Sequence, residues 1–139
     1  MEIIKLRHQV IEQALKTLEN GLKELKGPIL NDNPQLYKLM RDGLIQRFEY
    51  SIDTFWKFLK IYLESQQKIT IEGPSPRVVL RLSLNSQLLN EDEFKILLNC
   101  ISDRNLTSHS YNEEIAEKIQ HQIPLYYTTM KNIIDKLRI

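Results

Sequence analysis

Hydrophobic residues recur three and four positions apart along most of the chain, which is the spacing of one face of an α-helix. Between residues 2 and 26 the repeating positions are Ile3, Leu6, Val10, Ile11, Ala14, Leu15, Leu18, Leu22 and Leu25. A second stripe of roughly thirty residues follows Asn33, a suitable N-cap, and Pro34, which suits the first helical position. The two stripes predict a pair of long helices that a short connection holds antiparallel.

Further helices are predicted after the segment SQQKITIEGPSP, whose glycine and prolines do not propagate a helix. Ser75 is placed to cap a third helix, and Asn90 with Glu93 has the spacing of a capping box for a fourth. Asn112 is placed to cap a fifth helix. These signals predict an all-α fold, an up-and-down antiparallel bundle of four or five helices, in which residues 1–139 form a single domain.

Composition and charge limit the function classes. Lysine and arginine total 19 against 18 for aspartate and glutamate, so no bulk field draws the protein to nucleic acid and an anion site must be local. Cys100 lies in the apolar stretch FKILLNCI, where packing is favoured over thiol reactivity. Charged residues are mixed with the apolar ones from the second position of the chain, so neither a signal peptide nor a membrane span is expected there. We therefore expect a cytoplasmic protein that does not associate with a membrane.

The segment RNLTSHSY, residues 104–111, interrupts the amphipathic pattern with polar and titratable side chains. On one unbroken helix Arg104 and Tyr111 share a face, whereas His109 projects about 140° away from Arg104. Two arrangements would bring the arginine and the histidine together. Either the helix breaks at the poor helix formers TSHS, or a two-fold dimer places the arginine of one chain against the histidine of the other.

These residue types suit the cleavage of a phosphodiester without a metal ion. A guanidinium binds phosphate in bidentate fashion, and an imidazole transfers protons near neutral pH. In RNA cleavage the 2′-hydroxyl would attack the adjacent phosphate, with His109 as acid or base and Arg104 stabilising the developing charge. Asn105 or Ser108 would position an oxygen. No metal site and no cofactor are expected, because no second histidine or cysteine has ligand spacing and no glycine-rich phosphate loop is present.

A purely structural interpretation also explains this segment, and spacing alone favours it. Asp103 and Arg104 would then form a solvated end of the fourth helix. His109 would be a partly buried, hydrogen-bonded residue, and Tyr111 would anchor the core.

Other unusual positions lie in the second stripe. Arg47, Glu49 and Asp53 interrupt it, and they suit either an ion-pair network within the bundle or one side of a cleft. The nearby aromatic residues favour the core or a dimer interface over a base-stacking platform, because they fall on an amphipathic helix. They are Phe55, Trp56 and Phe58.

The segment RNLTSHSY resembles the R-x4-H-x-Y motif of the HEPN superfamily. Its surroundings resemble one branch, the nucleotidyltransferase substrate-binding proteins, in the stretches QRFEYSIDTFWKFLKIYL, SPRVVLR and DRNLTSHSYNEEIAEKI. The resemblance covers roughly residues 35–137. It implies a homodimeric helical bundle that assembles with a minimal nucleotidyltransferase, the MNT protein.

The resemblance implies two roles. In the first, the protein is a toxin with metal-independent ribonuclease activity on tRNA or mRNA, and the MNT protein silences it by transferring AMP to the motif tyrosine. In the alternative, it is the non-catalytic substrate-binding subunit of a two-chain nucleotidyltransferase. Carried over by position, Arg104 and His109 are catalytic, Asn105 is the supporting polar residue, and Tyr111 accepts AMP.

Overall fold

The computed structural model describes residues 2–109 and 111–137, and every regular element in those ranges is helical. The elements are α1 (Glu2–Leu25), the 3₁₀ helix η1 (Pro28–Asp32), α2 (Pro34–Ser65), α3 (Pro76–Asn85), α4 (Glu91–His109) and α5 (Glu113–Lys136). In this part of the chain, no helix combines the length and the hydropathy that crossing a bilayer requires.

The helices begin where the capping residues predicted. The side chains of Asn33, Ser75 and Asn112 each accept a hydrogen bond from the backbone N–H three residues later, at 3.1, 3.3 and 2.9 Å. Asn90 and Glu93 form the reciprocal pair of a capping box, with bonds of 2.8 and 2.9 Å. Because these bonds satisfy backbone donors that a helix leaves free, local sequence accounts for four helix starts.

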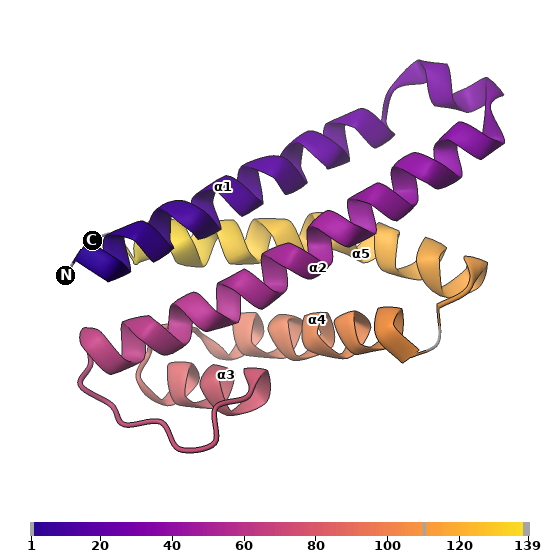
Figure 1. Ribbon diagram of the computed structural model, residues 1–139. Helices are drawn as coiled ribbons and strands as arrows, with labels where there is room; N and C mark the ends of the chain where they lie inside the picture. The colour runs from indigo at the N-terminus through magenta and orange to yellow at the C-terminus, as the bar shows by residue number, and fades with distance from the viewer. Residues whose placement is uncertain (1, 110, 138–139) are drawn as a thin grey trace.

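The helices pack as the predicted antiparallel bundle (Figure 1). α1 runs along α2 in the opposite direction, α5 lies against α1, α2 and α4, and the short α3 packs on α2 and α4. The start of α1 meets the end of α5, where His8 Nε2 lies 3.4 Å from the carbonyl oxygen of Ile134. Gly21 allows α1 close to α2, since a Cβ there would lie 3.0 Å from side-chain atoms of Leu44 and Arg47.

Most residues of the predicted stripes lie in the core, but Ile3 and Leu6 are exposed, and Ile4 is the buried residue at the start of α1. Phe48, Phe55 and Phe58 of α2 are fully buried in the core. The preference for packing over base stacking is confirmed for Phe55 and Phe58, while Trp56 is partly buried against the same core. Cys100 is buried, as expected of a core residue, and desolvation raises the pKa of its thiol well above the ordinary value.

The structural interpretation of Asp103 as a solvated residue is wrong. Asp103 is buried and accepts a 2.5 Å hydrogen bond from the hydroxyl of Tyr126, which is 2 % exposed. Burial, followed by this bond, raises the pKa of Tyr126. The pair joins α4 to α5 at the residue that precedes Arg104, so the end of α4 is held in place from inside the core.

Candidate functional site

Helix α4 continues through Thr107 and Ser108 and ends at His109. The helix break that would have turned His109 toward Arg104 is therefore absent. The hydroxyls of both polar residues are bound locally: Thr107 Oγ1 donates to the backbone oxygen of Arg104 at 2.7 Å, and Arg104 Nη1 donates to Ser108 Oγ at 2.9 Å. These bonds support a last turn that residue propensities alone disfavour.

The Arg104 guanidinium extends from α4 to α2, where it meets two carboxylates. Nη1 donates to Glu49 Oε2 at 2.9 Å, while Nε and Nη2 donate to the two oxygens of Asp53 at 3.3 and 3.2 Å. The bonds to Asp53 are the main reason that the pKa of Arg104 is raised. Glu49 and Asp53 therefore form the ion-pair network that was one of their two predicted roles.

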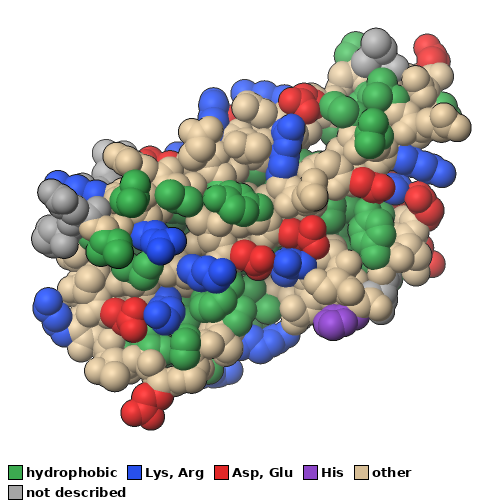
Figure 2. All heavy atoms as spheres, in the orientation of Figure 1, with side chains coloured by type: hydrophobic (Ala, Val, Ile, Leu, Met, Phe, Trp, Pro, Cys, Tyr) green, Lys and Arg blue, Asp and Glu red, His purple; other side chains and the backbone are tan. Residues whose placement is uncertain are grey.

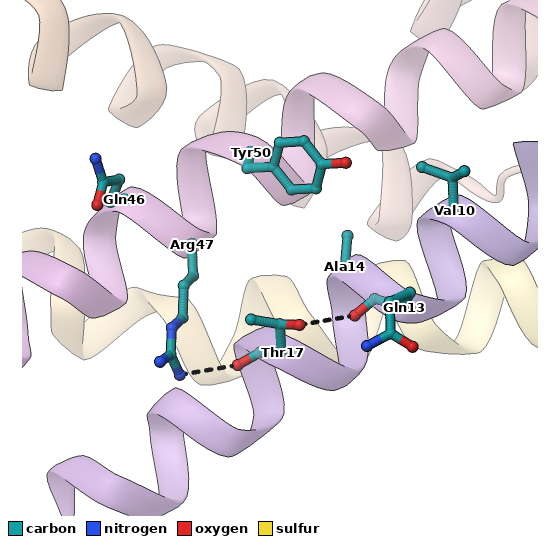
Figure 3. Close-up of a pocket in the computed structure, with 7 residues that line it drawn as sticks. All are labelled: Val10, Gln13, Ala14, Thr17, Gln46, Arg47 and Tyr50. Carbon is teal, nitrogen blue, oxygen red and sulfur yellow. Dashed lines mark hydrogen bonds between the residues drawn. The ribbon is translucent and has the colours of Figure 1, made fainter.

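Arg47 does not belong to this network. Its Nη1 donates to the backbone oxygen of Thr17 at 3.2 Å and lies 3.6 Å from Glu24, both on α1. Figure 3 shows this side chain pointing from α2 toward α1, beside a hollow of about 410 Å³. The lining of that hollow is mostly apolar and includes none of residues 104–111. Glu49 and Asp53 thus bind Arg104 of α4, whereas Arg47 binds α1.

His109 and Asn105 are exposed, and the side chain of neither forms a hydrogen bond or ion pair with any described residue. The interpretation of His109 as a partly buried, hydrogen-bonded residue is therefore wrong. Helical geometry places His109 about 140° around α4 from Arg104, whose guanidinium faces α2. One chain alone thus keeps the two predicted catalytic groups on different sides of the same helix.

Tyr111 lies just after α4 and is not a core anchor, because 44 % of it is exposed. Its hydroxyl donates a short hydrogen bond to Asp42 Oδ1 on α2. Desolvation, together with this bond to a carboxylate, raises the pKa of Tyr111 to about 12. A nucleophilic oxygen and a proton acceptor are thus already in contact on the surface.

We expect the Tyr111 hydroxyl to ionise near pH 12, above the ordinary value of 10.0. The Asp42→Ala variant should have a lower pKa for Tyr111, since the acceptor and its charge are removed, while desolvation and the charges of Arg41 and Glu113 remain. Subtracting the near-ultraviolet absorbance titration of Tyr111→Phe from that of each protein isolates this group, with circular dichroism checking the fold at each pH. Equal titration of Tyr111 with and without Asp42 would contradict the assignment.

Arg41 is a member of the site that the sequence analysis missed. It is only 1 % exposed, and its guanidinium binds three carboxylates: Glu113 at 2.8 Å, Glu117 at 3.0 Å and Asp42 at 3.1 Å. Hydrogen bonds, led by that to Glu113, raise its pKa although burial opposes this. A signal was available, because Arg41 lies three, four and seven residues before apolar positions of the α2 stripe, where an uncharged residue is expected.

Asp42 connects Arg41 to Tyr111, since its Oδ1 accepts bonds from both. Two guanidinium groups are surrounded by five carboxylates: those of Asp42, Glu49, Asp53, Glu113 and Glu117. Figure 2 shows acidic and basic side chains gathered where α2 faces α4, with hydrophobic side chains around them. Among the described residues, no group of three His, Cys, Asp or Glu side chains has an arrangement that could hold a metal ion.

The family model described as "Nucleotidyltransferase substrate binding protein like" matches residues 6–139. The chain belongs to this family. A crystal structure of a protein from Thermus thermophilus is similar to it, with 38 % identity and a TM-score of 0.78 over 93 % of this chain and 99 % of the other. The comparison with curated proteins found no match for the present chain.

Two further solved structures share the fold at lower identity. A Shewanella oneidensis HEPN toxin, described as tri-AMPylated and in complex with MNT antitoxin, has a TM-score of 0.74 and 17 % identity over 97 % of this chain and 96 % of that one. A mutant of the toxin–antitoxin MntA-HpeT has a TM-score of 0.72 and 18 % identity over the same shares. The predicted branch, the nucleotidyltransferase substrate-binding proteins, is confirmed by the family model, and the likeness to these toxin structures is one of fold.

Proposed function

We propose that this protein is the HEPN partner of an MNT-type nucleotidyltransferase and that Tyr111 is the residue to which AMP is transferred. Family membership supports the partner, as do the HEPN toxins in complex with MNT antitoxin that share the fold. The observation that carries the acceptor assignment is that Tyr111 is exposed and that its hydroxyl is bound to Asp42. That pair is the nucleophile and base that a phenol ester requires.

In the proposed transfer, the phenol oxygen of Tyr111 attacks the α-phosphorus of ATP. The bond between the α-phosphorus and the bridging oxygen breaks, and pyrophosphate leaves. Asp42, which already accepts the hydrogen bond from this hydroxyl, takes the phenol proton and releases it to water. The nucleotidyltransferase supplies ATP and positions its phosphates, while this chain supplies the acceptor and the base.

We further propose that the unmodified protein cleaves RNA without a metal ion, in the cytoplasm. The 2′-oxygen of the substrate attacks the adjacent phosphorus and the 5′-oxygen leaves, so the products carry a cyclic phosphate and a 5′-hydroxyl. His109 transfers the protons and Arg104 stabilises the charge on the phosphate, with Asn105 and Ser108 as supporting polar residues. Because the guanidinium and the imidazole lie on different sides of α4, each site combines Arg104 of one chain with His109 of the other in a homodimer.

AMP on Tyr111 would silence this activity by occupying the space beside α4 and adding negative charge there. The alternative function is that of a non-catalytic substrate-binding subunit. One observation favours it: five carboxylates surround the two guanidinium groups, and this excess of negative charge opposes the approach of RNA phosphates. Nuclease activity of the purified protein separates the two functions.

The family resemblance implies that a nucleotidyltransferase is encoded beside this protein. The partner assignment is tested by incubating the protein with ATP and that nucleotidyltransferase. Intact mass and peptide mapping should find AMP on Tyr111 of the wild type and none at that position in Tyr111→Phe. Tyr50→Phe is the matched control, because Tyr50 is 57 % exposed and lies on α2 in the lining of the hollow beside Arg47, which does not include Tyr111. Unchanged mass of the wild type, or AMP only on other residues, would refute the proposal.

A further inference from the structure

A groove of about 370 Å³ opens directly beside Tyr111. One wall is α2, where Leu39, Gly43 and Gln46 follow at spacings of four and three residues and so share a face. Thr107 of α4 and Tyr111 itself form the opposite wall. Leu39 is 69 % exposed, so the groove presents an apolar surface to whatever enters it.

Gly43 is unusual within this wall. It lies inside α2, where glycine is less favourable than alanine, and a Cβ built on it would meet nothing within 4 Å. No contact within the described part of the chain therefore requires the missing side chain. A helical glycine with no neighbouring atoms around its Cβ position allows an external group to approach the backbone closely.

The polar atoms of the groove suit a neutral ligand that carries hydroxyl and amino groups. Asp42 binds Arg41 and Tyr111 through Oδ1, and Glu49 binds its partners through Oε2, so each carboxylate keeps one oxygen without a bond to a described residue. Such oxygens accept bonds from ribose hydroxyls. Gln46 is exposed, and its carboxamide has no hydrogen bond with a described residue. In Figure 3 it points away from Arg47 and α1.

We propose that this groove binds the nucleoside part of the nucleotide attached to Tyr111, an inference that rests on the proposed function. The adenine lies against Leu39 and over Gly43, and the Gln46 carboxamide pairs with its N6 and N7 positions. The ribose hydroxyls bind the free oxygens of Asp42 and Glu49. The phosphate is fixed by its ester bond to the Tyr111 oxygen, which lies beside Asp42 in the lining of the groove.

The test is a titration of the unmodified protein with adenosine, in which the amide chemical shifts are monitored by ¹⁵N NMR. We expect shifts centred on Leu39, Gly43 and Gln46, and binding at least about tenfold weaker in Gly43→Trp, which fills the groove. Gly43→Ala is the matched control and should bind like the wild type. Gln46→Leu should remove the preference for adenosine over inosine, which lacks the N6 amino group.

The outcomes separate this inference from the function on which it rests, because the titration needs neither ATP nor the nucleotidyltransferase. Absence of adenosine shifts at the groove, or equal binding by Gly43→Trp and Gly43→Ala, would overturn it even if Tyr111 accepts AMP. Leu39→Ala supplies a second variant if Gly43→Trp fails to fold, and it should also weaken binding. If Gly43→Trp instead changes the molar mass in solution and adenosine produces no shifts, the groove is a contact between two copies of the chain.

Discussion

His109→Ala is expected to reduce RNA cleavage by the unmodified protein at least about 10²-fold, because general acid–base catalysis contributes about 10²- to 10⁴-fold. Arg104→Ala should cause a loss of about 10²- to 10³-fold, since it removes the group that stabilises charge on the phosphate. The assay uses labelled tRNA and mRNA in EDTA, after intact mass has shown that Tyr111 carries no AMP. Wild-type products should end in cyclic phosphates.

Matched controls keep the interpretation specific. His121→Ala removes another exposed histidine, on α5, and Arg77→Ala removes a guanidinium that donates to Ser102 on α4. Both variants should cleave like the wild type. No cleavage by folded, unmodified wild type would instead support the substrate-binding subunit.

A mixing experiment tests whether two chains build each site. If Arg104 of one chain works with His109 of the other, Arg104→Ala and His109→Ala protein mixed and allowed to exchange should regain activity. About a quarter of the wild-type rate is expected, because half of randomly formed dimers are mixed and each has one complete site of two. A mixture as inactive as its components would show that the residues do not act across a dimer.

Arg41→Ala is expected to lower the free energy of unfolding by about 3 kcal/mol, because it empties a buried position and removes the charge-assisted bonds to three carboxylates. This value is at the lower end for a buried ion pair, since the carboxylates left behind reach solvent. Arg41→Met should cost less, because it keeps the packing of the stem. Denaturant unfolding followed by circular dichroism measures both. Arg47→Ala is the control and should cost at most about 1 kcal/mol.

The same variants predict a pH dependence. The bond to Arg41 lowers the pKa of Glu113 below its ordinary 4.5, so the stabilisation from this pair is present above pH 4.5. It is lost as the pH falls through the lowered, folded-state pKa. The difference in unfolding free energy between the wild type and Arg41→Met should therefore shrink in acid. A difference that stays constant below pH 4.5 would mean that packing alone explains the effect of Arg41.

The helices and their starts could be predicted from local sequence, because periodicity and capping involve residues within a few positions of one another. Asn33 and the Asn90–Glu93 box cap as expected. The course of α4 through Thr107 and Ser108 could not, since poor helix formers there are held by bonds within the last turn.

What the sequence by itself determined is an all-helical bundle, the positions of its caps, and membership of the nucleotidyltransferase substrate-binding family. Only the tertiary structure decided which side chains meet in the site. Arg104 pairs with Asp53, and Tyr111 with Asp42, although 51 and 69 residues separate them. Such pairings depend on which face of α2 packs beside α4 and α5. Many helix arrangements satisfy the same apolar stripes, so the partners of each polar residue follow from packing and not from spacing along the chain.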